Sequence, residues 1–332
     1  MVSWIVKLWL RTLIWLGIIS MIPLIVEAHV KWFVPLSGVP PARPYQLFDA
    51  IVIVWLIVGA IVIGIGILLE RKLPSLRKIS YPFFEYIDPV IISLFSILIG
   101  FSFIIFSISG YIFTPLLVLH TPFERVLQGL QALIGISLMF GVVVQLSSIS
   151  LFLLYLVVGW YFGFSNFIDM FQIPGIALML FFAGRPHWAF LDVQKLFALP
   201  GPYLAYAVPL LRIFTGINLV ILGFHEKILH PELGLAFLKK YPWNFIKMLG
   251  FDNFSDYWFV FSTGAVEVLF GIIFILGIIT RINAGILTTI FITTLVLLGP
   301  VEFTGHLPYF TIIMVLLIFG SGSKLKLFPT TC

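Results

Sequence analysis

Apolar runs of roughly 20 residues recur along this chain, separated by short polar or proline-rich segments. An α-helix rises about 1.5 Å per residue, so such a run matches the roughly 30 Å hydrocarbon core of a bilayer. The alternating pattern of transmembrane β-strands is absent. The pattern predicts an all-α, polytopic membrane protein with about ten transmembrane helices. These are expected over residues 12–26, 48–69, 90–112, 126–144, 148–164, 173–183, 203–224, 259–280, 282–298 and 306–319.

Composition supports the same class. Of the 332 residues 61% are hydrophobic and only 10% are charged, and the mean hydropathy is +1.15, which excludes a water-soluble domain. The net charge of +5 does not indicate nucleic-acid binding, because the basic residues adjoin the apolar runs. The single cysteine, Cys332, excludes an internal disulfide and a dithiol relay to quinone. We therefore expect membrane lipids as surroundings and no nucleic-acid partner.

Basic residues predict the topology. The densest cluster follows the second run, at residues 70–78, and positive charge favours the cytoplasmic side. Alternation then places both termini in the cytoplasm, together with Arg185, Lys195, Arg281, Lys324 and Lys326. Residues 225–257, which mix aromatic and lysine side chains, are expected on the outer side as one or two short interfacial helices. This bias suits a prokaryotic plasma membrane.

Two segments of the chain are similar to two later ones. Residues 131–145 align with 267–281, which places Gly135 on Gly271, and residues 95–115 align with 211–231, which places Gly100 on Gly216. This predicts two four-helix units pointing the same way through the membrane, after two leading helices. The expected divisions are residues 1–80, with the two helices and the basic loop, 81–200, the degenerate unit, and 201–332, the unit with the charges.

The two copies differ in their polar residues. Ser96 stands where the second copy has Arg212, and Gln131 where it has Glu267. Tyr111 likewise replaces Lys227. The first unit therefore keeps glycines that let helices approach and lacks the charges. We infer that it is a packing partner, and that the second unit holds any chemistry.

Glu267 is the most informative single residue, because a carboxylate inside an apolar run is costly unless it meets a donor or water. Gly264, Glu267 and Gly271 share one helix face. On the preceding helix Arg212, Gly216, Gly223 and Lys227 lie within a stripe of about 60°. Small residues on both helices predict that the two stripes face each other. The candidate catalytic residues are Glu267 and Arg212.

The depth of these residues leaves alternatives open. Counting along the helices places Glu267 about 18 Å and Arg212 about 10 Å from the cytoplasmic end. Arg212 then either reaches up to Glu267 or extends to the cytoplasmic interface beside Arg281. Asn218 is closer in height to Glu267 but faces another side. A buried polar contact that only fixes helix register is the competing explanation.

Further polar residues gather near the outer ends of the same helices, where His225, Lys227, His230 and His306 are expected. Lysine and histidine there could attract an anionic substrate or carry protons. Their spacing does not indicate a metal site or haem. The candidate substrate-binding residues are Lys227, His225, Asn218, Arg281 and His306.

Residues 205–322 resemble DoxX-type four-helix membrane proteins, and residues 88–187 resemble a degenerate copy of them. The resemblance rests on the Arg-x3-Gly pattern at Arg212, the Gly-x3-Lys pattern at Lys227, the Gly-x2-Glu pattern at Glu267, and Thr-Arg-x2-Ala at Arg281. It implies a quinone-facing redox subunit, as in thiosulfate:quinone oxidoreductase, with Arg212, Lys227, Glu267 and Arg281 as motif residues. The duplicated architecture departs from the family pattern.

Three functions follow from these observations. The first is a quinone-associated redox subunit, with quinone as its cofactor and with electrons from a partner subunit or directly from the donor. The alternative is a non-catalytic accessory or assembly subunit of a larger membrane complex. Small-molecule transport is less well supported, because broken spans with paired polar residues in both units are missing.

Overall fold

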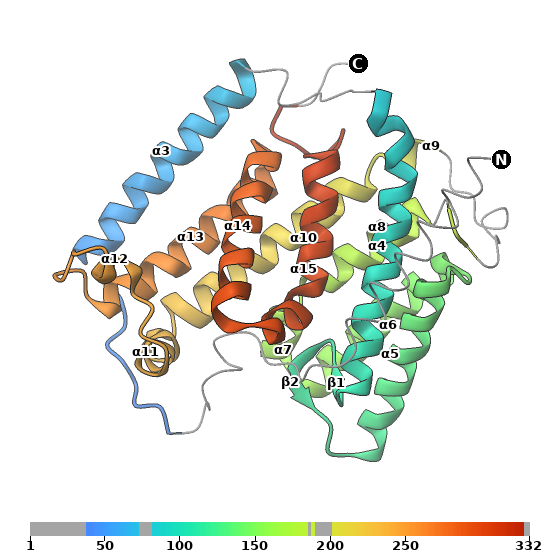
Figure 1. Ribbon diagram of the computed structural model, residues 1–332, viewed down its shortest axis with the longest axis horizontal. Helices are drawn as coiled ribbons and strands as arrows, with labels where there is room; N and C mark the ends of the chain where they lie inside the picture. The colour runs from blue at the N-terminus through green and yellow to red at the C-terminus, as the bar shows by residue number, and fades with distance from the viewer. Residues whose placement is uncertain (1–37, 73–81, 185–186, 190–200, 329–332) are drawn as a thin grey trace.

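The computed structural model describes residues 38–72, 82–184, 187–189 and 201–328 (Figure 1). These residues are mainly helical, apart from a short antiparallel pair of strands. In chain order the elements are α3 Ala50–Lys72, α4 Pro82–Ile108, β1 Tyr111–Ile112, β2 Thr114–Val118, α5 Pro122–Phe140, α6 Val144–Phe162, α7 Phe164–Asp169, α8 Gln172–Ala183, α9 Gly201–Leu204, α10 Ala207–Leu222, the π-helix η3 Gly223–Ile228, α11 Pro231–Lys240, α12 Phe245–Met248, α13 Asp256–Leu276, α14 Thr280–Leu298 and α15 Pro300–Phe319.

Five helices in the described residues are long and apolar enough to cross a bilayer, as an integral membrane protein requires. They are α3, residues 89–108 of α4, α6, α10 continued by η3, and α13. Three further apolar helices are shorter and lie in α8, α14 and α15. The all-α membrane class is thus supported, and the count of about ten spans stays a prediction. The expected span 12–26, the cluster beyond Lys72 and the residues Arg185 and Lys195 lie outside the described residues.

The helices pack in a layered bundle. The closest neighbours are α10 with α13, α4 with α5, α10 with α8, and α14 with α15, and α15 also packs on α4. In Figure 1, α4, α5 and α6 form one side of the molecule, α10 and α13 cross its centre, and α3 stands at the opposite edge. One large apolar core runs through both halves, from Phe95 on α4 to Leu316 on α15.

Glycines let two helix pairs come into backbone contact. A Cβ added to Gly216 on α10 would lie 2.6 Å from the carbonyl oxygen of Gly271 on α13. A Cβ added to Gly100 on α4 would lie 2.5 Å from the carbonyl oxygen of Gly135 on α5. No side chain fits at such distances, so both crossings require glycine. These four glycines are the ones aligned between the two sequence segments.

The turns that follow these helices have matching backbone angles. α5 ends at Gly141, with φ 70° and ψ 38°, and α13 ends at Gly277, with φ 67° and ψ 35°. Two residues later, Val143 (φ 43°, ψ 49°) and Ile279 (φ 40°, ψ 32°) both take the left-handed region, which β-branched residues rarely adopt. The two helix pairs therefore share their crossing and their exit turn.

Polar contacts tie helix α3 to α13 and to the turn that follows it. Near one end, Trp55 Nε1 donates to Ser262 Oγ at 2.8 Å, and near the other the Ile279 amide donates to Glu70 Oε2 at 3.1 Å. Arg71, in the last turn of α3, lies 4.8 Å from the ring centre of Phe328, which brings the basic end of this helix beside the carboxy-terminal segment. The basic residues at these two places thus lie at one end of the molecule.

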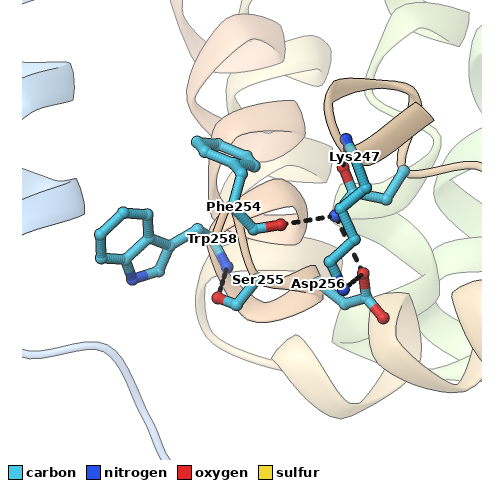
Figure 2. Close-up of polar contacts among 6 residues, drawn as sticks. Lys247, Phe254, Ser255, Asp256 and Trp258 are labelled. Atoms are coloured by element: carbon cyan, nitrogen blue, oxygen red, sulfur yellow. Dashed lines mark hydrogen bonds and ion pairs between the residues drawn. The ribbon is translucent and has the colours of Figure 1, made fainter. Parts of the chain in front are cut away.

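The segment between η3 and α13 contains the two short helices expected there, α11 and α12. Figure 2 shows how it joins α13: Lys247 Nζ donates to Asp256 Oδ1 at 2.8 Å, and Ser255 Oγ accepts from the Trp258 amide at 3.2 Å. Asn244 Nδ2 donates to Phe254 O and to Asp256 Oδ1, at 3.0 and 2.9 Å. An acidic residue and a serine cap at the helix start match the positive end of its dipole.

Gly216→Leu should destabilise the folded protein by about 1–3 kcal/mol or more, because the larger side chain forces α10 and α13 apart. Thermal unfolding of the purified protein in detergent measures the effect. The control is Gly59→Leu on α3, where an added Cβ meets no atom within 4 Å. Equal thermal stability of both variants would contradict the proposed role of this glycine crossing.

Candidate functional site

Lys227 and Glu267 form an ion pair where η3 crosses α13. Lys227 Nζ donates to Glu267 Oε2 at 2.6 Å, and the two side chains are 15% and 20% exposed. Glycines make the contact possible, since a Cβ on Gly264 would lie 2.9 Å from the Cβ of Lys227 and 3.0 Å from the carbonyl oxygen of Gly223. The predicted facing of the two glycine stripes is therefore confirmed.

A widened helical turn sets the directions of the residues beside this pair. Gly223–Ile228 is π-helical and continues α10. Within it Glu226 is buried, with 1% exposure, while the neighbouring Lys227 reaches Glu267. π-helical turns often occur at functional sites, because the extra residue redirects side chains. The hydrophobic pattern of the sequence carries no signal for this turn.

Of the two alternatives for Arg212, the one in which it reaches up to Glu267 is wrong, because its guanidinium contacts the end of α13. Its side chain is fully buried, and Nη1 donates to the carbonyl oxygens of Phe274 and, at 3.0 Å, Ile275. Nη2 donates to Leu325 O. The guanidinium thus holds the carboxy-terminal carbonyls of α13, where the helix dipole favours a cation, and joins them to the segment after α15. Gly277 leaves the space for it, since a Cβ there would lie 2.5 Å from Nη1.

Arg281 has the corresponding role at the end of α15. Its Nε donates to Leu317 O at 3.2 Å and its Nη2 to Ile318 O at 2.9 Å. A Cβ on Gly320 would lie 2.9 Å from its Nη1, so a glycine again makes room. Arg281 therefore contacts the helix-end carbonyls of α15, and its substrate-binding role stays a prediction.

The first unit makes related contacts with neutral side chains. Ser96, aligned with Arg212, donates to Leu138 O at 2.9 Å, and Leu138 aligns with Phe274. Gln145, aligned with Arg281, donates to Phe181 O at 3.1 Å. Gln131, aligned with Glu267, donates to Tyr111 O at 3.2 Å, whereas Glu267 accepts from Lys227. The two units thus have hydrogen-bonding side chains at corresponding positions, and these are neutral in the first unit and charged in the second.

Asn218 lies at the centre of a second polar cluster, on a face of α10 other than the one toward Glu267. Its Oδ1 accepts from Tyr309 Oη at 2.8 Å and from the Gln172 amide at 3.2 Å. Its Nδ2 donates to Asp169 O at 3.0 Å. One buried side chain therefore joins α10 to α15 and to the junction of α7 and α8.

A small cavity of about 30 Å³ adjoins this cluster. Its polar lining comes from Thr114, Asn166, Asp169, Gln172, Glu226 and Tyr309. The Asp169 side chain is only 6% exposed and its Oδ1 lies 3.1 Å from His225 Nδ1. The volume exceeds the roughly 10–15 Å³ that one water molecule needs. A buried space with two carboxylates in its wall is therefore large enough to be occupied.

The cavity and the ion pair are neighbours. Tyr309 interacts electrostatically with Glu267, Glu226 and Asp169, and Lys227 with both Glu267 and Glu226. His306 lies apart from His225 in its contacts, since its ring stacks on Phe291 with a centroid distance of 4.8 Å. The predicted cluster of outer polar groups is thus divided: His225 and Lys227 contact this region, the His230 ring lies 5.5 Å from the His225 ring, and His306 packs among aromatic rings.

Sequence reasoning missed four residues of this region: Asp169, Gln172, Glu226 and Tyr309. Glu226 stands between His225 and Lys227 in the sequence, and that position is a signal which could have singled it out. Asp169 and Tyr309 meet it only through the fold. In the parts of the chain that the structure describes, no group of three or more His, Cys, Asp or Glu residues is arranged to bind a metal ion.

Comparison with known proteins adds no relative. No protein-family model matches the chain, and no curated protein or solved structure is significantly similar to it. The DoxX-like resemblance therefore stays a prediction, and the argument for function rests on the residues of this chain.

Lys227→Gln and Glu267→Gln should each lower the free energy of unfolding by about 1–3 kcal/mol, because either change breaks the ion pair and leaves the remaining charge with little solvent. The double variant should lose less than the sum of the two. Thermal unfolding in detergent measures the three values. Glu232→Gln is the control, because its pair with the half-exposed His230 is worth little. Additive losses would mean that the two side chains do not stabilise each other.

Proposed function

We propose that this protein is an integral membrane, quinone-associated subunit of a redox system, similar in role to the quinone-facing subunit of thiosulfate:quinone oxidoreductase. The observation that carries the proposal is the Lys227–Glu267 pair, which joins an ammonium group to a carboxylate at 2.6 Å on otherwise apolar helices. Both side chains keep some exposure, so a ligand entering from the lipid can reach them.

The two charged groups match the two states of a quinone headgroup. A quinone carbonyl accepts hydrogen bonds, which the Lys227 ammonium donates, and a quinol hydroxyl donates, which the Glu267 carboxylate accepts. The apolar surface around them suits the isoprenoid tail. Electrons come from a partner protein, and the proposed role of this chain is to bind and orient the quinone and exchange its protons.

Duplication explains why only one half carries this pair. We infer two parallel four-helix units after two leading helices, about ten spans in all. Support comes from the matching glycine crossings, the matching turns at Gly141 and Gly277, and the corresponding carbonyl contacts of Ser96 and Arg212. The neutral unit provides packing, while Arg212 and Arg281 hold helix ends in the charged unit and so position it.

The proposed location is a prokaryotic plasma membrane, with both termini in the cytoplasm. The basic end of α3 lies beside the segment that carries Lys324 and Lys326, as the contact of Arg71 with Phe328 indicates. Positive charge gathered at one end of a membrane bundle favours the cytoplasmic side. We also propose assignment to the DoxX-like family, on the motif residues Arg212, Lys227, Glu267 and Arg281.

One observation favours the accessory function as a second candidate. In α3, only 11% of the membrane-length window is buried inside the protein, and its outer face presents Val54, Ile57, Ile61 and Ile65. Lipid covers such a face as well as a partner helix does. An accessory subunit would use it for assembly, and the Lys227–Glu267 pair would then only fix helix register.

Reconstituted protein should be labelled by a photoreactive quinone near Lys227 and Glu267, and Glu267→Gln should weaken labelling by about 10- to 100-fold, since a hydrogen bond to a charged group is lost. Competition by unlabelled quinone, read by mass spectrometry of the labelled peptides, measures it. Glu232→Gln should label like the wild type. A folded Glu267→Gln variant with unchanged labelling would exclude the quinone function and favour the accessory one.

A further inference from the structure

Protons cannot reach the proposed quinone contact through the lipid. Reduction of a quinone to a quinol takes up two protons together with two electrons, and the hydrocarbon of a bilayer holds no water to supply protons. The Lys227–Glu267 pair lies on otherwise apolar helices, and both side chains are largely buried. A polar route through the protein is therefore needed to bring protons to this pair.

A histidine–carboxylate pair lies where such a route can begin. His225 Nδ1 lies 3.1 Å from Asp169 Oδ1, and the two side chains are 26% and 6% exposed. The half-exposed His230 has its ring 5.5 Å from that of His225. Histidine is the side chain that most readily takes up and releases protons near neutral pH. This pair therefore joins the surface, at the end of α10 that η3 forms, to a buried carboxylate.

The cavity continues from this pair into the bundle. Asp169, Glu226 and Tyr309 line it, and its volume of about 30 Å³ exceeds the roughly 10–15 Å³ that one water molecule needs. Gln172 lies in the same wall with 8% exposure, and its Oε1 has no hydrogen-bond partner among the described residues. Because most buried acceptors in folded proteins are satisfied, this oxygen indicates that a small donor such as water occupies the cavity. Water in this space links Asp169 to Glu226.

Glu226 connects the cavity to the ion pair. Its side chain lies in the cavity wall and interacts electrostatically with Lys227, which also donates to Glu267. Tyr309, in the same wall, interacts electrostatically with Glu226 and Glu267. The ionisable groups that these contacts place along the route are Asp169 on α7, His225, Glu226 and Lys227 on η3, Glu267 on α13 and Tyr309 on α15.

We propose that this cavity holds water and carries protons between the His225–Asp169 pair and the Lys227–Glu267 pair, a role that rests on the proposed quinone function. The Lys227 ammonium gives a proton to a reduced quinone oxygen and regains one from the Glu226 carboxyl group. Cavity water then passes a proton from Asp169 to Glu226, and His225 restores Asp169 from the surrounding water. Two such transfers, with two electrons from the redox partner, convert quinone to quinol.

Bound water in the cavity is tested by pulsed X-ray footprinting of the full-length protein in detergent, in which radiolysis of water oxidises neighbouring side chains. Met170, which lines the cavity, should be oxidised although it is only 2% exposed. Met179, on α8 and outside the cavity wall, is the matched control with 1% exposure and should not react. Gln172→Leu should lower Met170 oxidation to the level of Met179, because leucine removes the acceptor. Equal oxidation of both methionines in the wild type would overturn the proposal.

Proton transfer is tested with the protein and quinone reconstituted in a membrane on an electrode, which supplies electrons without the partner. Asp169→Asn and Gln172→Leu should each slow quinone reduction about tenfold or more and increase its solvent deuterium isotope effect, because proton supply becomes limiting. Both should keep wild-type labelling by the photoreactive quinone. Glu232→Gln, which removes a carboxylate outside the cavity wall, should reduce quinone like the wild type.

The outcomes separate the two proposals. Unchanged reduction rates in variants that still bind quinone would overturn the proton route and leave the quinone function standing. Absence of quinone labelling in the wild type would overturn the quinone function, and the route with it. If Asp169→Asn does not fold, Gln172→Leu decides the question, since it removes no charge.

Discussion

Lipid hydrocarbon neither donates nor accepts hydrogen bonds, so polar groups inside the apolar bundle need partners within the protein. The structure of this protein depends on those partners. Charged side chains that enter the apolar bundle meet partners there. Arg212 and Arg281 contact the carbonyls at two helix ends, and Lys227 meets Glu267. Each contact requires backbones to come close, which the glycines at the α10–α13 crossing and at the two helix ends allow.

The same constraint explains how the two halves of the chain diverge. In the first half Ser96 and Gln131 satisfy carbonyl oxygens with neutral donors. In the second half Arg212 and Glu267 occupy the aligned positions and introduce charge. A carboxylate only accepts hydrogen bonds and cannot pair with a carbonyl, so the second half supplies the Lys227 ammonium where the first has Tyr111. A functional site is therefore best sought in the second half, where charged residues stand in place of the neutral ones.

Two polar regions result, and they lie side by side. The ion pair keeps some exposure at the side of the bundle, whereas Asp169 and Glu226 are enclosed around the small cavity. Tyr309 interacts electrostatically with the acids of both. A change of charge at one region, by ligand or proton, is therefore felt at the other, because the low dielectric of the bundle screens it little.

Hydrophobic patterning determined much of this molecule in advance. The length and apolar character of the runs predicted the helices, and the spacing of small residues predicted that the stripes on α10 and α13 face each other, because helical periodicity alone places residues on a face. The internal similarity in the sequence likewise indicated which positions to compare.

Tertiary structure decided which charged groups meet. Helical spacing gives a direction but not a partner, so it left open whether Arg212 reaches Glu267. In the structure Arg212 reaches the end of α13, and Lys227 donates to the Glu267 carboxylate. The π-helical turn that separates Glu226 from Lys227 has no pattern in the sequence. The cavity joins Asp169, Glu226 and Tyr309 across long sequence separations. Only the packing of three separate elements brings these residues together, because no local preference links them.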